Sequence, residues 1–171
     1  MILKTDRLYL RKMKQSDFVA LCKILQDEEV MYAYEHAFST EEAQEWLARQ
    51  LKHYDDYGFG LWAVILKQTD EMIGQCGLTL QNWGQRQVLE IGYLFQKKYW
   101  HNGYATEAVK GCKKYAFEQL DKDEVFSIIR DTNIASQNVA KRNGMKACGE
   151  FIKHYYHVDM PHLVFSVKRT I

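Results

Sequence analysis

Residues 90–108 carry the sequence EIGYLFQKKYWHNGYATEA, in which an apolar strand leads through a polar loop into a helix. The pattern predicts that the strand ends near Phe95 and that the helix begins at Tyr104. A helix N-terminus presents free backbone N–H groups and a partial positive charge, and both attract phosphate. Gly103 has no side chain to hold an anion away from the backbone. The stretch therefore predicts a pyrophosphate site.

The flanking residues fit this prediction but do not exclude a simpler one. Lys97 and Lys98 precede the turn and supply positive charge. However, Gly103-Tyr104-Ala105 is a single small-x-small step, and it matches neither GxGxxG nor GxxxxGK[ST]. The alternative is a strand-to-helix turn that needs small residues only for packing.

Outward from this stretch, the chain predicts a fold of the α/β (α+β) class. Period-two runs predict strands at residues 8–11, 61–66, 72–80, 88–95, 125–129, 149–156 and 162–169, with a polar loop at 81–87. Helix-spaced stripes predict helices after caps at Ser16 and Ser39, from Tyr104, and over 135–142. This order predicts a mixed, mostly antiparallel central sheet of about six to seven strands with helices on both faces.

Composition favours one domain over residues 1–171. The chain has a single proline, Pro161, and no low-complexity segment, and its formal net charge is +1, which argues against a nucleic-acid partner. The N-terminus lacks the order of a signal peptide, and no apolar run is long enough to span a membrane. A cytoplasmic protein with no membrane partner is the expectation.

The four cysteines exclude two common kinds of site. They are too far apart for a CxxC redox or zinc pattern, so no metal is expected. Because each lies among apolar neighbours, buried reduced thiols are expected at Cys22, Cys76, Cys112 and Cys148.

Residues 131–145 form a second stretch of interest, DTNIASQNVAKRNGM. Asn133 and Ser136 stand where they can cap a short helix, and Gly144 stands in the left-handed position after its end. Capping by itself explains these residues, so spacing alone assigns them no function.

Four segments carry motifs that occur together in one protein family. Residues 100–105, WHNGYA, fit Q/R-x-x-G-x-G/A apart from the first position, and residues 5–11 fit T-x-R-L-x-L-R. Residues 73–78 fit I-G-x-x-G-L, and residues 133–145 fit N-x-x-S-x-x-V-A-x-K/R-x-G-M. The chain thus resembles the GNAT superfamily of N-acetyltransferases, nearest to the subfamily that includes ribosomal-protein alanine N-acetyltransferases.

The resemblance implies acetyl-CoA as co-substrate, no metal, and splayed central parallel strands that hold the pantetheine between them. By resemblance, the strand end that pairs with pantetheine consists of Tyr93, Leu94 and Phe95. The pyrophosphate loop consists of Trp100, His101, Asn102, Gly103, Tyr104 and Ala105. Asn133 and Ser136 are expected to contact the cofactor beside the short helix.

The resemblance also implies how an amine would be acetylated. An attacking amine must lose a proton, and Glu90, on the strand that ends at the acyl site, is the candidate general base; a surface charge or an arginine partner is the alternative for it. Many relatives have a tyrosine that protonates the leaving thiolate, but Ala140 occupies that position here. Tyr32, Tyr34 and Glu35 are the candidate substrate residues.

Two functions are therefore weighed. The first is an N-acetyltransferase that transfers acetyl from acetyl-CoA to a peptide or small-molecule amine, acting as a monomer or homodimer. The alternative is a non-catalytic acyl-CoA-binding domain with the same fold, which the missing tyrosine at position 140 favours.

Overall fold

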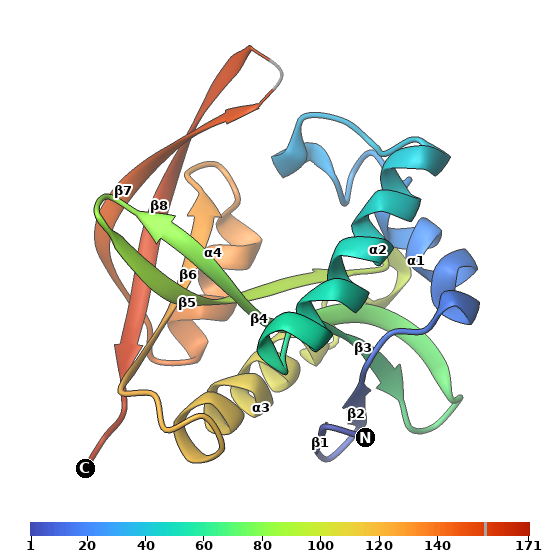
Figure 1. The fold of residues 1–171 in the computed structure, drawn as a ribbon, viewed down its shortest axis with the longest axis horizontal. Helices are drawn as coiled ribbons and strands as arrows, with labels where there is room; N and C mark the ends of the chain where they lie inside the picture. The colour runs from blue at the N-terminus through green and yellow to red at the C-terminus, as the bar shows by residue number, and fades with distance from the viewer. Residues whose placement is uncertain (156) are drawn as a thin grey trace.

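An eight-stranded sheet runs through the molecule in the order β1-β2-β3-β4-β5-β6-β8-β7 (Figure 1). All neighbouring pairs are antiparallel except β5 and β6. The strands are β1 Leu3–Lys4, β2 Leu8–Arg11, β3 Leu61–Leu66, β4 Glu71–Trp83, β5 Arg86–Phe95, β6 Glu124–Arg130, β7 Lys146–Tyr155 and β8 Val158–Lys168. This computed structural model describes residues 1–155 and 157–171, so Tyr156 of the predicted strand 149–156 lies outside the described residues.

Helices cover both faces of the sheet, as the sequence predicts. They are α1 Phe18–Leu25, α2 Thr40–Tyr57, α3 Tyr104–Glu118 and α4 Ile134–Arg142. Successive residues of β4 point to opposite faces: Gln75 accepts a hydrogen bond from Trp46 of α2, whereas Cys76 contacts Cys112 of α3. None of the described helices combines the length and the apolar character that crossing a membrane requires.

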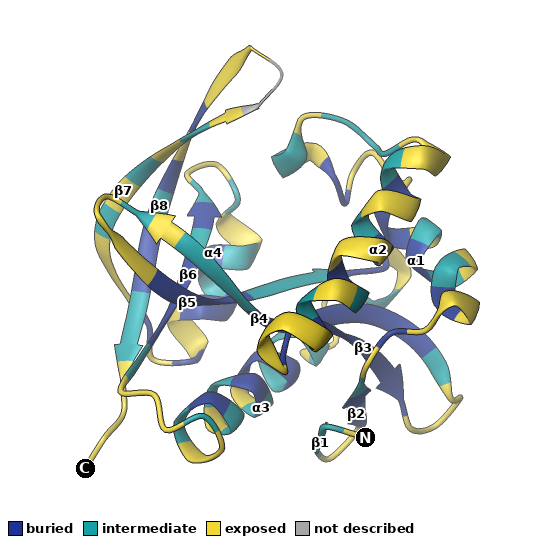
Figure 2. Ribbon diagram, in the orientation of Figure 1, coloured by how far each residue is buried: buried dark blue, intermediate teal, exposed yellow. Residues whose placement is uncertain are grey.

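Burial follows this layered arrangement (Figure 2). The central strands are buried, and β3 is buried along its whole length. Trp62 is fully buried and packs edge-on against Tyr115 of α3, with ring centroids 5.1 Å apart. The outward face of α2 is exposed (Figure 2). The core therefore fixes β4 and β5, the two strands that carry the candidate site, between two helical layers.

The ends of α2 confirm the sequence prediction. Ser39 accepts a hydrogen bond from the backbone N–H of Glu42, and the Glu42 carboxylate accepts one from the backbone N–H of Ser39. The helix ends at Tyr57, and Gly58 after it is left-handed with a φ of 76°.

The two parallel strands diverge at the centre of the sheet. β5 and β6 are in register only at Glu90 and Phe126 among the described residues. Just beyond this point, the Ser127 hydroxyl donates to the carbonyl of Ile91, and the backbone N–H of Ile128 donates to the Glu90 carboxylate. Side chains thus replace the ladder bonds there, and the predicted splay of the central strands is confirmed.

Two local predictions about the sheet need correction. The sheet has eight strands instead of six to seven, partly because a two-residue edge strand is too short to leave a sequence pattern. The predicted loop at 81–87 is only a two-residue turn at 84–85: β4 continues to Trp83 and β5 begins at Arg86, because Trp83 packs across Gly149 and beside Phe126. The other polar residues of this stretch are strand positions.

The other two corrections concern one cap and the cysteines. Asp17, not Ser16, precedes α1, and its carboxylate accepts from the backbone N–H of Lys14 and from Arg11. A carboxylate offers two acceptor oxygens, so it satisfies both donors together. Cys76 and Cys112 are buried as predicted, but Cys22 is half-buried, and Cys148 is exposed at a register shift in β7.

Candidate active site

The N-terminus of α3 presents a continuous row of unused donors. Within the described part of the chain, the backbone N–H groups of residues 101–106 have no hydrogen-bond acceptor, and the first backbone bond of the helix runs from Glu107 to Gly103. All six residues are exposed or half-buried. Such a row, at the positive end of a fifteen-residue helix, favours an anion. We call residues 101–106 the phosphate cradle.

The backbone of the cradle is held in a concave shape by two left-handed residues. His101 has a φ of 63°, and Gly103 has a φ of 79°. A side chain at Gly103 would be strained by that φ, and its Cβ would lie 3.4 Å from Nη2 of Arg7. The Asn102 amide donates to the carbonyls of Tyr99 and Trp100, which closes the turn.

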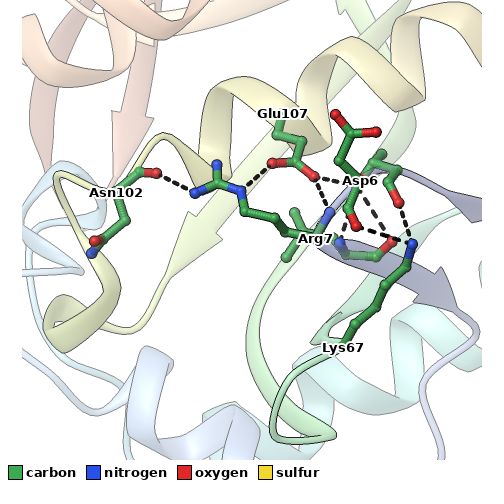
Figure 3. A network of polar contacts seen from close by, with 7 residues as sticks. Asp6, Arg7, Lys67, Asn102 and Glu107 are labelled. Carbon is green, nitrogen blue, oxygen red and sulfur yellow. Dashed lines mark hydrogen bonds and ion pairs between the residues drawn. The ribbon is translucent and has the colours of Figure 1, made fainter.

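A network from the start of the chain fastens the cradle to the sheet (Figure 3). The Arg7 guanidinium donates to the carbonyl of Asn102 at 2.8 Å and to the Glu107 carboxylate at 2.7 Å. It also lies over the Tyr104 ring, 4.4 Å from the centroid. The same carboxylate accepts from the Thr5 hydroxyl and from the Arg7 backbone. Arg7 thus binds a carbonyl oxygen of the loop, and the backbone N–H groups of the loop stay free.

The charge of Glu107 is stabilised by this network. Burial by itself raises the pKa of its carboxyl, but the hydrogen bonds from Thr5 and Arg7 outweigh burial and lower the pKa below its usual value. The carboxylate is therefore ionised at neutral pH and holds Arg7 in place.

The splay between β5 and β6 forms a small cavity of about 80 Å³. Tyr93 and Leu94, predicted to pair with pantetheine, line it together with Asn133 and Ser136. Phe95 is buried against Gly74 instead, and its carbonyl accepts a hydrogen bond from the indole of Trp100.

The start of α4 has a side-chain cap. The Asn133 side chain accepts from the backbone N–H of Ser136, and its carbonyl accepts from Gln137. The Tyr93 hydroxyl donates to the carbonyl of Ser136 at 2.7 Å, and burial raises the pKa of this phenol. Ala140 is fully buried. The capping predicted for Asn133 is therefore present, while its contact with a cofactor stays a prediction.

A larger cavity of about 350 Å³ lies on the α2 side of the same strands. Its aromatic wall consists of Tyr34, Phe38 and Trp46, whose ring centroids are 5.7 to 6.3 Å apart. The predicted substrate residue Tyr34 lines both cavities, whereas Tyr32 and Glu35 line neither. Tyr32 instead lies beneath the guanidinium of Arg130.

Glu90 lies at the junction of the two cavities and lines both. Only 9% of it is exposed. Burial raises the pKa of its carboxyl, and the charge of Lys153, the N–H of Ile128 and the Thr79 hydroxyl partly oppose the rise. A carboxyl with a raised pKa is a stronger base once ionised, which suits proton removal from an amine.

Several site residues were missed by sequence reasoning. Arg7 lies in the matched segment 5–11, but no motif assigns it a partner about a hundred positions away. Lys153 and Gln75 enter the larger cavity from β7 and β4, and nothing local marks them. Lys153 comes near Glu90, and Gln75 contacts Trp46, only in the folded protein. Among the described residues, no group of three or more His, Cys, Asp or Glu side chains could hold a metal ion.

Comparisons with known proteins agree with this geometry. The family model of the acetyltransferase (GNAT) domain matches residues 7–146. The uncharacterized protein YkkB of Bacillus subtilis (strain 168) is 36% identical over 144 residues, which are 84% of each chain. The uncharacterized N-acetyltransferase YoaA of the same organism is 27% identical over 163 residues, covering 94% of this chain and 92% of the relative.

Solved structures share the fold along nearly the whole chain. The acetyltransferase (GNAT family) from Bacillus anthracis superposes with a TM-score of 0.84 at 23% identity, covering 98% of both chains. A spermidine N-acetyltransferase from Vibrio cholerae, solved in complex with CoA and spermine, superposes with a TM-score of 0.74 at 17% identity and covers 95% of both.

Proposed function

Since the chain belongs to the GNAT acetyltransferase family, we propose that it transfers an acetyl group from acetyl-CoA to a primary amine, either a protein N-terminus or a small amine, by direct attack in a ternary complex. The observation that carries this proposal is the phosphate cradle. Six consecutive backbone N–H groups without acceptors at a helix N-terminus match the oxygens of a pyrophosphate. Acetyl-CoA fits the site because the cradle follows β5 in the chain, and Tyr93 and Leu94 near the end of β5 line the cavity that Glu90 also lines.

Each part of the site has a role in this reaction. The cradle, fastened by Arg7, holds the pyrophosphate, and the edge of β5 at Tyr93 and Leu94 orients the thioester, which supplies the acetyl group. Glu90 takes a proton from the amine, directly or through a water. The N–C bond of the amide forms, the C–S bond breaks, and the thiolate leaves with the electron pair.

The leaving thiolate has no dedicated acid among the described residues of this site. Ala140 carries no acid, and the Tyr93 phenol is half-buried and already donates to the carbonyl of Ser136. A thiol has a pKa of about 8.5, so its thiolate is a tolerable leaving group near neutral pH without a dedicated acid.

Ala140 also supports a second candidate function, a non-catalytic acyl-CoA-binding domain. The two functions are separated by titrating acetyl-CoA calorimetrically and then measuring thiol release with a panel of amines. Binding with release on one class of acceptor supports the enzyme. Binding without release on peptides, amino acids, polyamines or aminoglycosides favours the binding domain, and no binding contradicts both. A cytoplasmic location and a monomeric or homodimeric state stay predictions.

The role of Glu90 is tested by Glu90→Gln. We expect turnover to fall about 100-fold, because a general base contributes on this order. CoA affinity should stay unchanged, since the amide oxygen can still accept from Ile128. The melting temperature should stay the same or rise, because the variant no longer buries a charge. Unchanged turnover at every pH would remove Glu90 from the mechanism.

A further inference from the structure

Gln75 carries a buried donor with no partner, in the wall of the larger cavity. The residue is only 1% exposed, and its Oε1 accepts from the Trp46 indole N–H at 3.0 Å. An indole nitrogen can only donate, so the amide oxygen faces Trp46 and the amide nitrogen is directed elsewhere. That nitrogen, Nε2, has no hydrogen-bond acceptor among the described residues.

A donor in this position is unusual for a folded protein. Buried polar groups nearly always have a partner, and one left without is destabilising. Gln96, the first residue after β5, offers a contrast: its amide is also buried, but its Nε2 donates to the carbonyl of Met72. Gln96 lines neither cavity. The unpartnered donor is therefore found where a ligand oxygen can supply the missing acceptor.

The charges around the cavity indicate which kind of ligand oxygen would accept from Gln75. Arg49 and Lys153 line the cavity with Gln75, and Glu90 is the only carboxylate among the described residues that line it. The guanidinium of Arg49 lies over the ring of Trp46, 5.7 Å from its centroid. A site with one buried carboxylate, two cations and a neutral donor suits a ligand that carries both charges. It does not suit a polyamine, which carries only positive charge.

We propose that the acceptor is an amine with a carboxylate on the adjacent carbon, as in a free α-amino acid, and that Gln75 is a specificity-determining residue that donates to the carboxylate. This inference rests on the proposed function and names its substrate class. Glu90 receives the amine, Gln75 with Arg49 and Lys153 receives the carboxylate, and the aromatic wall of Tyr34, Phe38 and Trp46 packs against an apolar side chain. The transfer then gives an N-acetyl amino acid and free CoA thiol.

The test compares amines that differ only at the carboxylate. Phenylalanine, phenylalaninamide and phenethylamine share one side chain, as do leucine, leucinamide and isopentylamine. Thiol release gives kcat/KM for each, expressed per unprotonated amine because the three amines of a series differ in pKa. We expect the acid to exceed the simple amine by at least about tenfold, because a buried donor left unpaired discriminates strongly. The amide should fall between them, and spermidine should not react.

Substitution of Gln75 should remove this discrimination. Gln75→Met keeps the volume but lacks the donor, so the ratio of acid to amine should fall about tenfold. Gln75→Glu still accepts from Trp46 but repels a carboxylate, so the ratio should fall further. Gln96→Met is the matched control, a buried glutamine outside the cavity, and it should leave the ratio unchanged. The acid-to-amine ratio is measured within each variant, so a lower fraction of folded enzyme changes both rates equally and leaves the ratio unchanged.

A further variant covers the case in which substitution at the buried position prevents folding. The Arg49 side chain is exposed, so Arg49→Met should fold and should still lower the acid-to-amine ratio. Turnover without a preference for the acid, faster turnover of the amide or of a peptide N-terminus, or turnover of spermidine would overturn the inference and leave the proposed function standing. Failure to bind acetyl-CoA would overturn the proposed function itself.

Discussion

The N-termini of α3 and α4 lie on the same side of the splayed strands, yet they treat their backbone donors in opposite ways. At α4, the Asn133 side chain caps the helix and accepts a hydrogen bond from the N–H group of Ser136. At α3, no side chain caps the helix, and Arg7 binds a carbonyl of the loop instead of competing for its donors. A side-chain cap at a helix N-terminus stabilises the helix, whereas an uncapped N-terminus leaves backbone N–H groups that a ligand can accept from.

The largest effect should come from closing the open terminus with Gly103→Glu. The carboxylate would occupy the phosphate cradle and repel the pyrophosphate. If this repulsion removes two charge-assisted hydrogen bonds between the cradle and the pyrophosphate, CoA binding should weaken by at least about 100-fold. Calorimetric titration measures the affinity. Gly58→Glu is the matched control, because Gly58 has a similar φ of 76° and open space around it, but lies at the far end of α2. Equal affinity in both variants would contradict the cradle.

A smaller effect on the same terminus is expected from Arg7→Met. The loop loses its anchor but keeps its N–H groups, so CoA affinity should fall about tenfold, which corresponds to about 1.4 kcal/mol. The control is Arg169→Met. Arg169 is similarly exposed and anchors the other end of α3, where its guanidinium donates to the carbonyl of Phe117 and to Asp121 and Asp123. If Arg169→Met weakens CoA binding as much as Arg7→Met does, the loss comes from a less stable α3 and not from the loop that Arg7 anchors.

At the self-capped terminus, Asn133→Ala should act mainly on folding. Removing an N-cap costs about 1 kcal/mol of unfolding free energy, which denaturant titration measures. Ser39→Ala at α2 is the matched cap deletion and should cost a similar amount. We expect CoA affinity to fall less than in Arg7→Met. A loss of affinity as large as that of Arg7→Met with unchanged stability would make cofactor binding the main role of Asn133, and the contrast between the termini would fail.

The smallest expected effect concerns pH and Glu107. The folded-state pKa of this carboxyl is lowered, so its stabilising contribution is present above the ordinary pKa of about 4.3 and is lost as pH falls through the folded-state pKa. Wild type should therefore melt above Glu107→Gln at pH 7, and the difference should shrink in acid. Thermal melts across this range measure it. A difference that is independent of pH would mean that the charge of Glu107 is unimportant.

The sequence predicts those features that depend on neighbouring residues. The capping box at Ser39 and Glu42, the strand at 61–66 and the left-handed Gly144 are all confirmed. Their signals lie within a few positions. The prediction of a loop at 81–87 was wrong because it too rested on neighbouring residues. The polarity of this stretch is typical of a loop, but Trp83 packs on residues distant in the sequence and so extends the strand.

The site could be predicted only in part. Its motif positions around Gly103 follow from sequence, but the free donors depend on the left-handed turn at His101, which no motif marks. The unpartnered amide of Gln75 depends on Trp46, a residue on another element. Such properties arise from pairs that meet only after folding.

The most direct test of the open cradle is an amide proton–nitrogen correlation spectrum recorded during titration with CoA. We expect the largest shifts at the amides of residues 101–106 and only small shifts at Ser136 and Gln137. Shifts concentrated at the start of α4, or at neither terminus, would contradict it.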